Sequence, residues 1–156
     1  MQFWKFKSLR RFLGLLFSLN MKSQWTWKDY AHSSSLQLST FIHDLLKPVE
    51  FDKIIYDRIQ LGLHEALINA VKHGNSNDKS KELRVRRIIT NNWIIWQIKD
   101  EGKGTPIDLR RCSLPERLDA ESGRGIYIIH QCFDDVRWSK KGSRLQIACK
   151  KNFPYQ

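Results

Sequence analysis

The amino-acid sequence predicts an α+β fold, a two-layer sandwich in which one mixed or antiparallel sheet is covered by helices on one face. Two segments, residues 36–46 and 52–73, have apolar side chains at helical spacing. Strand-like runs follow them in pairs that are joined by turn residues, which is typical of antiparallel hairpins. The length of 156 residues corresponds to about one domain.

The first elements are expected to be a strand and two helices. Residues 24–31 are rich in aromatic side chains and predict a strand. Three serines precede residues 36–46, where they can cap a helix that ends before Pro48. A longer apolar stripe predicts a helix over residues 52–73, with Gly74 as its stop.

Four further strands and a third helix complete the expected fold. The runs 83–90 and 93–99 meet at Asn91-Asn92, a dipeptide that tolerates positive φ and suits a tight hairpin. Residues 125–132 predict a helix. Two closing strands, 136–139 and 144–150, are expected around a turn at Lys141-Gly142.

Several side chains of the expected strands are interpreted as structural. Trp93 and Trp96 have opposite parity, so we expect one in the core and the other partly exposed. The run 84–87 contains three arginines and predicts a basic outer face, for an acidic partner or for solvent. The remaining tryptophans are expected to pack rather than to stack on nucleic-acid bases: Trp4, Trp25, Trp27 and Trp138.

Composition excludes several classes of protein. Hydrophobic residues make up 41% and aromatic residues 12%, which is too apolar for a disordered chain. Three widely spaced cysteines without a CxxC pair argue against a disulfide framework and against zinc, and favour buried thiols in the cytoplasm. The net charge is +11, but six basic residues precede the first acidic residue, Asp29. This distribution argues against a nucleic-acid partner, for which charge is the sole indication.

Residues 1–21 differ from the rest of the chain. They combine a basic start with the apolar run Phe12–Leu19, but no small-residue cleavage site follows. We therefore expect an N-terminal extension over residues 1–21 and one domain over residues 22–156. Three interpretations of the extension stay open: a basic amphipathic arm that contacts a membrane through residues 1–20, a disordered extension, or a reading frame whose true start is Met21.

The long helix carries a polar stripe. Glu65, Asn69 and His73 follow one another at i, i+4 and i+8, so an α-helix would place all three on one face. A carboxylate can accept a proton, and a neighbouring amide oxygen can bind Mg²⁺. An ordinary solvated stripe has the same spacing, so spacing alone decides nothing.

Two glycine-rich segments follow later in the chain. Asp100-Glu101-Gly102-Lys103-Gly104 comes directly after a strand, where glycines let the backbone approach a ligand and the carboxylate can accept from an exocyclic amine. Glu121-Ser122-Gly123-Arg124-Gly125-Ile126 opens a helix, whose free amides can bind a phosphate. Each segment alone also describes a plain turn or a weak GxG match.

Taken together, the three segments resemble the N, G1 and G2 boxes of the GHKL ATPase superfamily, which has the Bergerat, histidine-kinase-like ATPase fold. The matching patterns are E-A-x-x-N-A-x-x-H-G at residues 65–74, D-x-G-x-G at 100–104 and G-x-G-hydrophobic at 123–126. Within the superfamily, the chain resembles the bacterial anti-sigma-factor serine/threonine kinases, the switch-protein kinases. The resemblance covers about residues 24–151.

The resemblance implies roles for individual residues. Glu65 is implied as the catalytic general base, Asn69 as the ligand of Mg²⁺, and Asp100 as the acceptor for the adenine amino group. The residues that it implies for binding ATP are Asn69, Lys72, His73, Asp100, Gly102, Gly104, Gly123, Arg124 and Gly125. Base, metal ligand, purine acceptor and phosphate amides are the groups that phosphoryl transfer by positioning requires.

The resemblance also implies a function. It implies a cytoplasmic ATP-binding anti-sigma factor that phosphorylates a serine of an anti-sigma-factor antagonist and so regulates transcription by partner switching. The implied partners are a sigma factor and that antagonist, and homodimer formation stays open. Glu121 departs from the family pattern, because some relatives have an arginine there and a carboxylate does not neutralise phosphoryl charge. A non-catalytic ATP-binding partner-switch or scaffold protein is the alternative.

Overall fold

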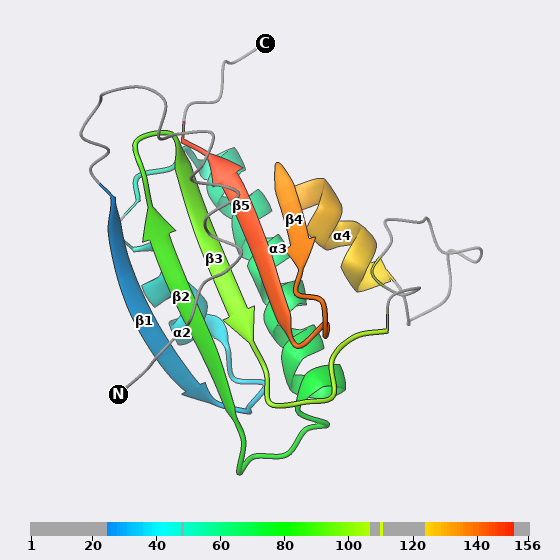
Figure 1. The fold of residues 1–156 in the computed structure, drawn as a ribbon. Helices are drawn as coiled ribbons and strands as arrows, with labels where there is room; N and C mark the ends of the chain where they lie inside the picture. The colour runs from blue at the N-terminus through cyan, green and yellow to red at the C-terminus, as the bar shows by residue number, and fades with distance from the viewer. Residues whose placement is uncertain (1–24, 48, 107–109, 111–123, 152–156) are drawn as a thin grey trace.

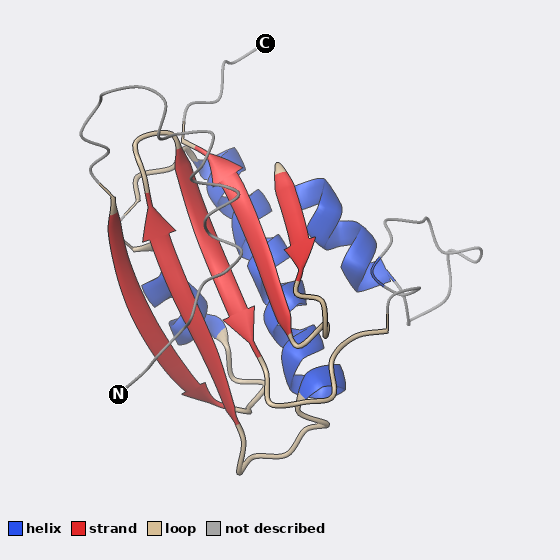
Figure 2. Ribbon diagram, viewed as in Figure 1, coloured by secondary structure: helices blue, strands red, loops and turns tan. Residues whose placement is uncertain are grey.

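The structure of the protein is a computed structural model that describes residues 25–47, 49–106, 110 and 124–151. The described residues form one five-stranded sheet with the strand order β1-β2-β3-β5-β4. Figures 1 and 2 show the described helices on one face of this sheet. The elements are β1 (Thr26–Ser33), α2 (Ser39–Leu46), α3 (Lys53–Asn69), the π-helical turn η1 (Ala70–Gly74), β2 (Glu82–Ile89), β3 (Trp93–Lys99), α4 (Arg124–Cys132), β4 (Asp135–Trp138) and β5 (Arg144–Lys150).

The predicted α+β sandwich is confirmed. Each of the four strand pairings in the described sheet is antiparallel, so the antiparallel form of the prediction is the one found. The expected domain boundary at residues 21–22 and the extension before it lie outside the described residues. Among the helices that the structure describes, none is long and apolar enough to cross a membrane.

The predicted hairpin between β2 and β3 is also confirmed, but without the predicted use of positive φ. Neither Asn91 nor Asn92 has a positive φ. The Thr90 N–H donates to the Trp93 carbonyl, and the Trp93 N–H donates to Thr90 Oγ1, both at 2.9 Å. Because the threonine hydroxyl supplies part of the turn, the backbone needs no left-handed residue there.

The hydrophobic core lies between the sheet and the helices. The predicted stripe of the long helix faces it, with Ile59, Leu63 and Leu67 fully buried. Trp96 is fully buried beneath α2, and its indole N–H donates to the Leu45 carbonyl at 3.4 Å. Trp93, on the opposite face, is partly buried, as its parity predicts. Burial of each large aliphatic side chain stabilises the fold by about 1.5–3 kcal/mol, which fixes α3 firmly on the sheet.

Some of the expectations for tryptophans and cysteines hold and others do not. Trp138 packs against the core, but Trp25 is 47% exposed and Trp27 is 52% exposed, so neither is a core residue. Trp27 packs instead against the Arg86 guanidinium, which lies 4.7 Å from its ring centre. Cys132 and Cys149 are buried as expected. Burial raises the pKa of the Cys149 thiol to about 12, which keeps it protonated and unreactive at neutral pH.

The predicted basic outer face is correct for two of the three arginines. Arg86 lies on the outer face and forms a two-pronged ion pair with Asp29 of β1, with N–O distances of 2.6 and 2.7 Å. Arg84 lies on the same face and pairs with Glu82. Arg87 instead faces inward and is 6% exposed, where it donates to the Leu45 carbonyl at 3.1 Å. Its role is therefore to hold the end of α2.

Candidate functional site

The first two residues of the polar stripe lie beside the start of α4. A Cβ atom built on Gly125 would lie 3.0 Å from Glu65 Oε2 and 3.1 Å from Asn69 Nδ2. The Glu65 side chain is 25% exposed, so solvent or a ligand can reach it. The fold thus brings the first and third predicted segments into contact, and the absence of a side chain at Gly125 makes this contact possible.

His73, the third residue of the stripe, lies on a π-helical turn rather than on the predicted α-helix. The α-helix ends at Asn69, and a π-helical turn follows in which the Asn75 N–H donates to the Ala70 carbonyl at 2.8 Å. The prediction of an α-helix as far as residue 73 is therefore wrong for the last turn, although the helical segment ends at Gly74 as predicted. Lys72 and His73 are exposed at the end of the helix.

The second predicted segment packs directly on the end of this helix. A Cβ atom on Gly102 would lie 1.9 Å from the Gly74 carbonyl oxygen. A Cβ atom on Gly74 would lie 2.4 Å from Asp100 Cγ. Both distances are far below van der Waals contact, so glycine is required at both positions for steric reasons. These contacts place the Asp100 carboxyl group against the helix that carries Glu65 and Asn69.

Asp100 is a half-buried carboxylate at the end of β3. Its Oδ1 accepts the Gly102 N–H at 2.8 Å. Burial raises the pKa of Asp100 above its ordinary value, against the opposing effects of backbone hydrogen bonds and of Lys99 and Lys81. An ionised carboxylate has about four acceptor positions, and the bond from Gly102 uses one. Asp100 is therefore able to accept further hydrogen bonds, such as one from the amino group of a base.

The end of the second segment lies on the turn between β4 and β5. Gly104 has a φ of +94°, and a Cβ atom on it would lie 2.0 Å from the Lys141 carbonyl oxygen. The Thr105 N–H donates to the Gly142 carbonyl at 3.2 Å. Arg110 adds a further link, because its Nε donates to the Thr105 carbonyl at 2.7 Å and its Nη1 donates to the Ser139 carbonyl at 3.2 Å. Backbone contacts thus fix both ends of the segment 100–104.

The third predicted segment is described only in part. Glu121, Ser122 and Gly123 lie outside the described residues, so the prediction of Gly123 as a phosphate-binding residue and the departure at Glu121 have no structural outcome here. Arg124 is exposed and begins α4. The first amides of a helix can bind an anion, and here they begin beside Glu65 and Asn69.

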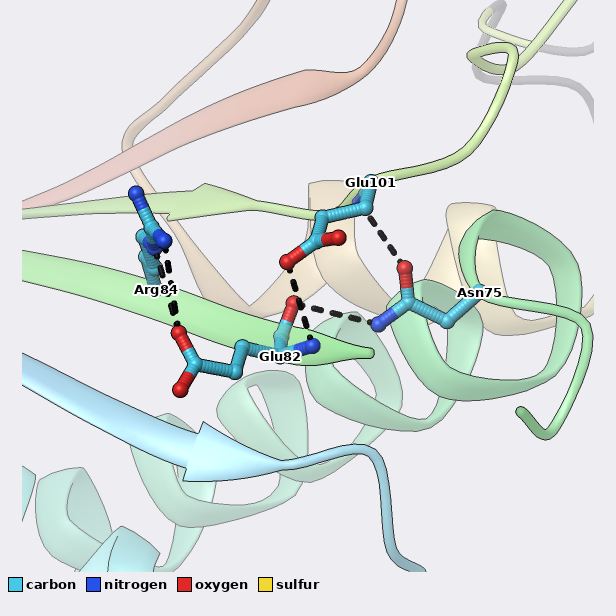
Figure 3. Close-up of polar contacts among 4 residues, drawn as sticks. All are labelled: Asn75, Glu82, Arg84 and Glu101. Atoms are coloured by element: carbon cyan, nitrogen blue, oxygen red, sulfur yellow. Dashed lines mark hydrogen bonds and ion pairs between the residues drawn. The ribbon is translucent and has the colours of Figure 1, made fainter. Parts of the chain in front are cut away.

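The structure reveals one site residue to which the sequence assigned no role. Asn75 follows the helix-ending Gly74 and is fully buried. Its Oδ1 accepts the Glu101 N–H at 2.8 Å, and its Nδ2 donates to the Glu82 carbonyl at 3.2 Å (Figure 3). Asparagine after glycine is common in loops, so only the three-dimensional contacts separate this residue from an ordinary loop residue.

These residues fit ATP. The half-buried Asp100 has acceptor positions that would suit the adenine amino group, and α4 begins beside Asn69, where its first amides would suit the phosphates. Across the described residues, no cluster of three or more His, Cys, Asp or Glu side chains is suited to a metal ion. A Mg²⁺ ion held by Asn69 would therefore take most of its ligands from phosphate and water, as Mg²⁺ usually does.

Comparison with known proteins agrees with this geometry. The curated proteins give no significant match. The family model of the histidine kinase-like ATPase domain matches residues 31–149, about three quarters of the chain. This span includes α3, the loop after β3 and the start of α4, which are the three parts that meet at the site. The chain therefore belongs to the histidine kinase-like ATPase family, and this membership implies that it binds ATP.

Proposed function

We propose that the protein is an ATP-dependent serine/threonine protein kinase that uses Glu65 as its general base. The observation that carries the proposal is the position of Gly125 at the start of α4. A Cβ atom there would lie 3.0 Å from Glu65 Oε2 and 3.3 Å from Asn69 Oδ1. A proton acceptor, a potential metal ligand and a helix N-terminus thus converge on one point, which is the arrangement that phosphoryl transfer requires.

Binding of the nucleotide is the first task of this site. Asp100 accepts the adenine amino group, and the glycine contacts between residues 74 and 102 keep that carboxylate in place. The start of α4 directs backbone amides at the phosphates. Asn69 would hold Mg²⁺ through its amide oxygen, and the ion would neutralise part of the phosphate charge.

Transfer of the phosphoryl group is the second task. The hydroxyl oxygen of a substrate serine forms a bond to the γ-phosphorus of ATP, and the bond from that phosphorus to the bridging oxygen breaks. The hydroxyl proton passes to the Glu65 carboxylate, and ADP leaves. The side chain of Glu65 is only partly buried, so an incoming serine can reach it.

The proposed partners are a sigma factor and the antagonist protein whose serine is phosphorylated. This part of the proposal is supported by the similarity of the three boxes to those of the anti-sigma-factor kinases. Phosphorylation of the antagonist would add a doubly charged group to its surface and change which partner it binds. The kinase would then regulate transcription by partner switching in the cytoplasm.

The first test is nucleotide binding followed by phosphate transfer. We expect the purified full chain to bind ATP more tightly with Mg²⁺ than without it, as measured by calorimetry. With γ-labelled ATP, a purified candidate antagonist should become labelled on serine. Glu65→Gln should keep ATP binding but lower the transfer rate by roughly 10²–10⁴-fold, the usual contribution of a positioned general base.

Asp57→Asn is the matched control for Glu65→Gln. It makes the same change from carboxylate to amide, on the same helix, at an exposed position two turns earlier. We expect it to leave both binding and transfer unchanged. If the wild-type chain binds Mg²⁺ and ATP but labels no candidate antagonist, the kinase proposal fails. A non-catalytic ATP-binding partner switch then becomes the better account.

A further inference from the structure

The ladder between β2 and β3 ends in an unusual way beside the site. The register is regular as far as the pair Arg84 and Lys99. If it continued, Glu82 would come opposite Glu101, and their backbone groups would bond to each other. Instead, the Glu101 N–H donates to Asn75 Oδ1, and the Glu82 carbonyl accepts from Asn75 Nδ2. The carboxamide of Asn75 thus stands between two backbone groups that would otherwise pair.

A second side chain replaces the other backbone hydrogen bond expected between Glu82 and Glu101. The Glu82 N–H donates to the Glu101 side chain, with an N–Oε1 distance of 3.3 Å (Figure 3). Both hydrogen bonds that would close the ladder at this rung are therefore made through side chains. The two strands part at this level, and the chain after β3 turns toward the end of the long helix.

This arrangement bears directly on Asp100. Asn75 follows Gly74, and Glu101 follows Asp100, so the bond between Asn75 and Glu101 flanks the close contact between Gly74 and Asp100. The Asn75 side chain is fully buried, so water does not compete for these bonds. The Asn75 carboxamide therefore fixes the position of the Asp100 carboxylate relative to a bound base.

We propose that Asn75 is a positioning residue that sets the preference of the site for adenine. It acts through Glu101 and the adjoining Asp100 rather than by touching the nucleotide. This inference rests on the proposed function, in which Asp100 accepts the adenine amino group.

The chemistry of the position explains why asparagine is needed there. The residue must accept from one backbone amide and donate to one backbone carbonyl, and a carboxamide does both. An ionised aspartate of the same size has no proton to donate, so it would leave the Glu82 carbonyl facing a carboxylate. Alanine would leave both backbone groups without this partner.

The decisive experiment compares two nucleotides that differ in the group of the base that Asp100 is proposed to bind. Inosine triphosphate has a keto oxygen where ATP has the amino group, so it presents an acceptor to the Asp100 carboxylate. Dissociation constants for both nucleotides with Mg²⁺ would be measured by calorimetry for the wild-type chain, Asn75→Ala and Asn75→Asp. We expect the wild-type preference for ATP to fall about tenfold or more in both variants, as for the loss of one charge-assisted hydrogen bond.

The ratio of the two constants is informative even if a variant is partly unfolded. Unfolded molecules bind neither nucleotide, so they weaken both apparent affinities by the same factor. Asn91→Ala serves as the control, because it removes an exposed asparagine from the hairpin at the other end of the same two strands. We expect the ratio for this variant to match the wild-type ratio.

Each outcome has a distinct meaning. If Asn75→Ala or Asn75→Asp weakens both nucleotides equally and keeps the wild-type preference, the inference is overturned and the proposed function stands. If the wild-type chain binds both nucleotides equally, Asp100 does not read the amino group and the inference fails, although ATP binding stands. If the wild-type chain binds neither nucleotide, the proposed function itself fails.

Discussion

The two ends of the β2–β3 pair are built in opposite ways. At the hairpin end, Thr90 and Trp93 form hydrogen bonds with each other across a two-residue turn. At the other end, the strands part, and Asn75 joins Glu101 across 26 positions of sequence. The hairpin end is closed by neighbours in the chain, whereas the site end is closed by Asn75, the residue that follows η1.

We expect this difference to separate residues that only stabilise the fold from residues that also affect ATP binding. A local turn needs only residues that suit a hairpin, and it can change without moving distant groups. The site end depends on contacts between segments that are far apart in sequence, so one altered side chain can shift Asp100 relative to Glu65. We therefore expect changes at the site end to alter ATP binding and changes at the hairpin end to alter stability alone.

The largest effect is expected from Gly102→Ala. The new methyl group would lie 1.9 Å from the Gly74 carbonyl oxygen, and its three nearest atoms all belong to the Gly74 backbone. Backbone cannot rotate aside as a side chain can, so the loop must move away from the helix. We expect ATP affinity to fall by about a hundredfold or more, and the free energy of unfolding to fall by about 1–3 kcal/mol.

Denaturant unfolding and calorimetry, each done on the same protein preparation, would check both effects. A variant that binds ATP normally would show that the contact between Gly74 and Gly102 does not position the loop. The steric account of the site would then be wrong.

A smaller effect is expected from Asp100→Asn. The amide can still accept the Gly102 N–H through its oxygen, but it lacks the charge that strengthens a bond to the adenine amino group. We expect the free energy of ATP binding to weaken by about 1–3 kcal/mol, which raises the dissociation constant about 5- to 150-fold. The unfolding midpoint should not fall, because burial disfavours the ionised carboxylate that the substitution removes.

The same residue predicts a pH dependence with a definite sign. Burial raises the pKa of Asp100 above its ordinary value of 3.8, so the carboxylate takes up its proton at a higher pH than an exposed aspartate would. ATP affinity of the wild-type chain should therefore fall as the pH is lowered toward that raised pKa. The cost of burying the charge falls over the same range, so the Asp100 contribution to unfolding free energy rises as the pH falls from the folded pKa to the unfolded one.

Asp100→Asn is also the control for this pH dependence. Adenine itself also gains a proton in acid, and the variant reports this effect together with any other that does not involve Asp100. An identical pH profile for the wild-type chain and Asp100→Asn would show that titration of Asp100 does not control binding.

Local and periodic features of the fold could be predicted from the sequence, whereas contacts between distant segments could not. Helices and strands were predictable because their apolar residues repeat every three to four or every two positions, as for Leu63 and Leu67 or for Trp96 and Ile98. The three glycine-rich and polar segments were recognisable as a set because their order and spacing resemble known boxes. Their members Glu65, Asn69 and Gly125 do meet in the structure.

Three features that the sequence missed have no periodic signature. The π-turn after Asn69 has no separate signature within an otherwise helical pattern. Arg87 looked like its outward neighbours, but its guanidinium reaches the carbonyl groups at the end of α2. Asn75 looked like a loop residue because its two partners, Glu82 and Glu101, lie on other segments. Periodicity gives no information about such partners.

The smallest effect on function is expected from Thr90→Val at the hairpin end. Valine keeps the branched shape and the strand preference but removes the hydroxyl that accepts the Trp93 N–H at 2.9 Å and donates to the Trp93 carbonyl at 3.2 Å. The lost bonds should lower the free energy of unfolding by about 0.5–1.5 kcal/mol, as measured with denaturant. ATP affinity should stay within about twofold of wild type, since the ladder from Ile89 to Arg84 separates this turn from the site. A loss of ATP affinity as large as that of Asp100→Asn would show that the two ends are coupled through the ladder. The separation of a stabilising end from a binding end would then be wrong.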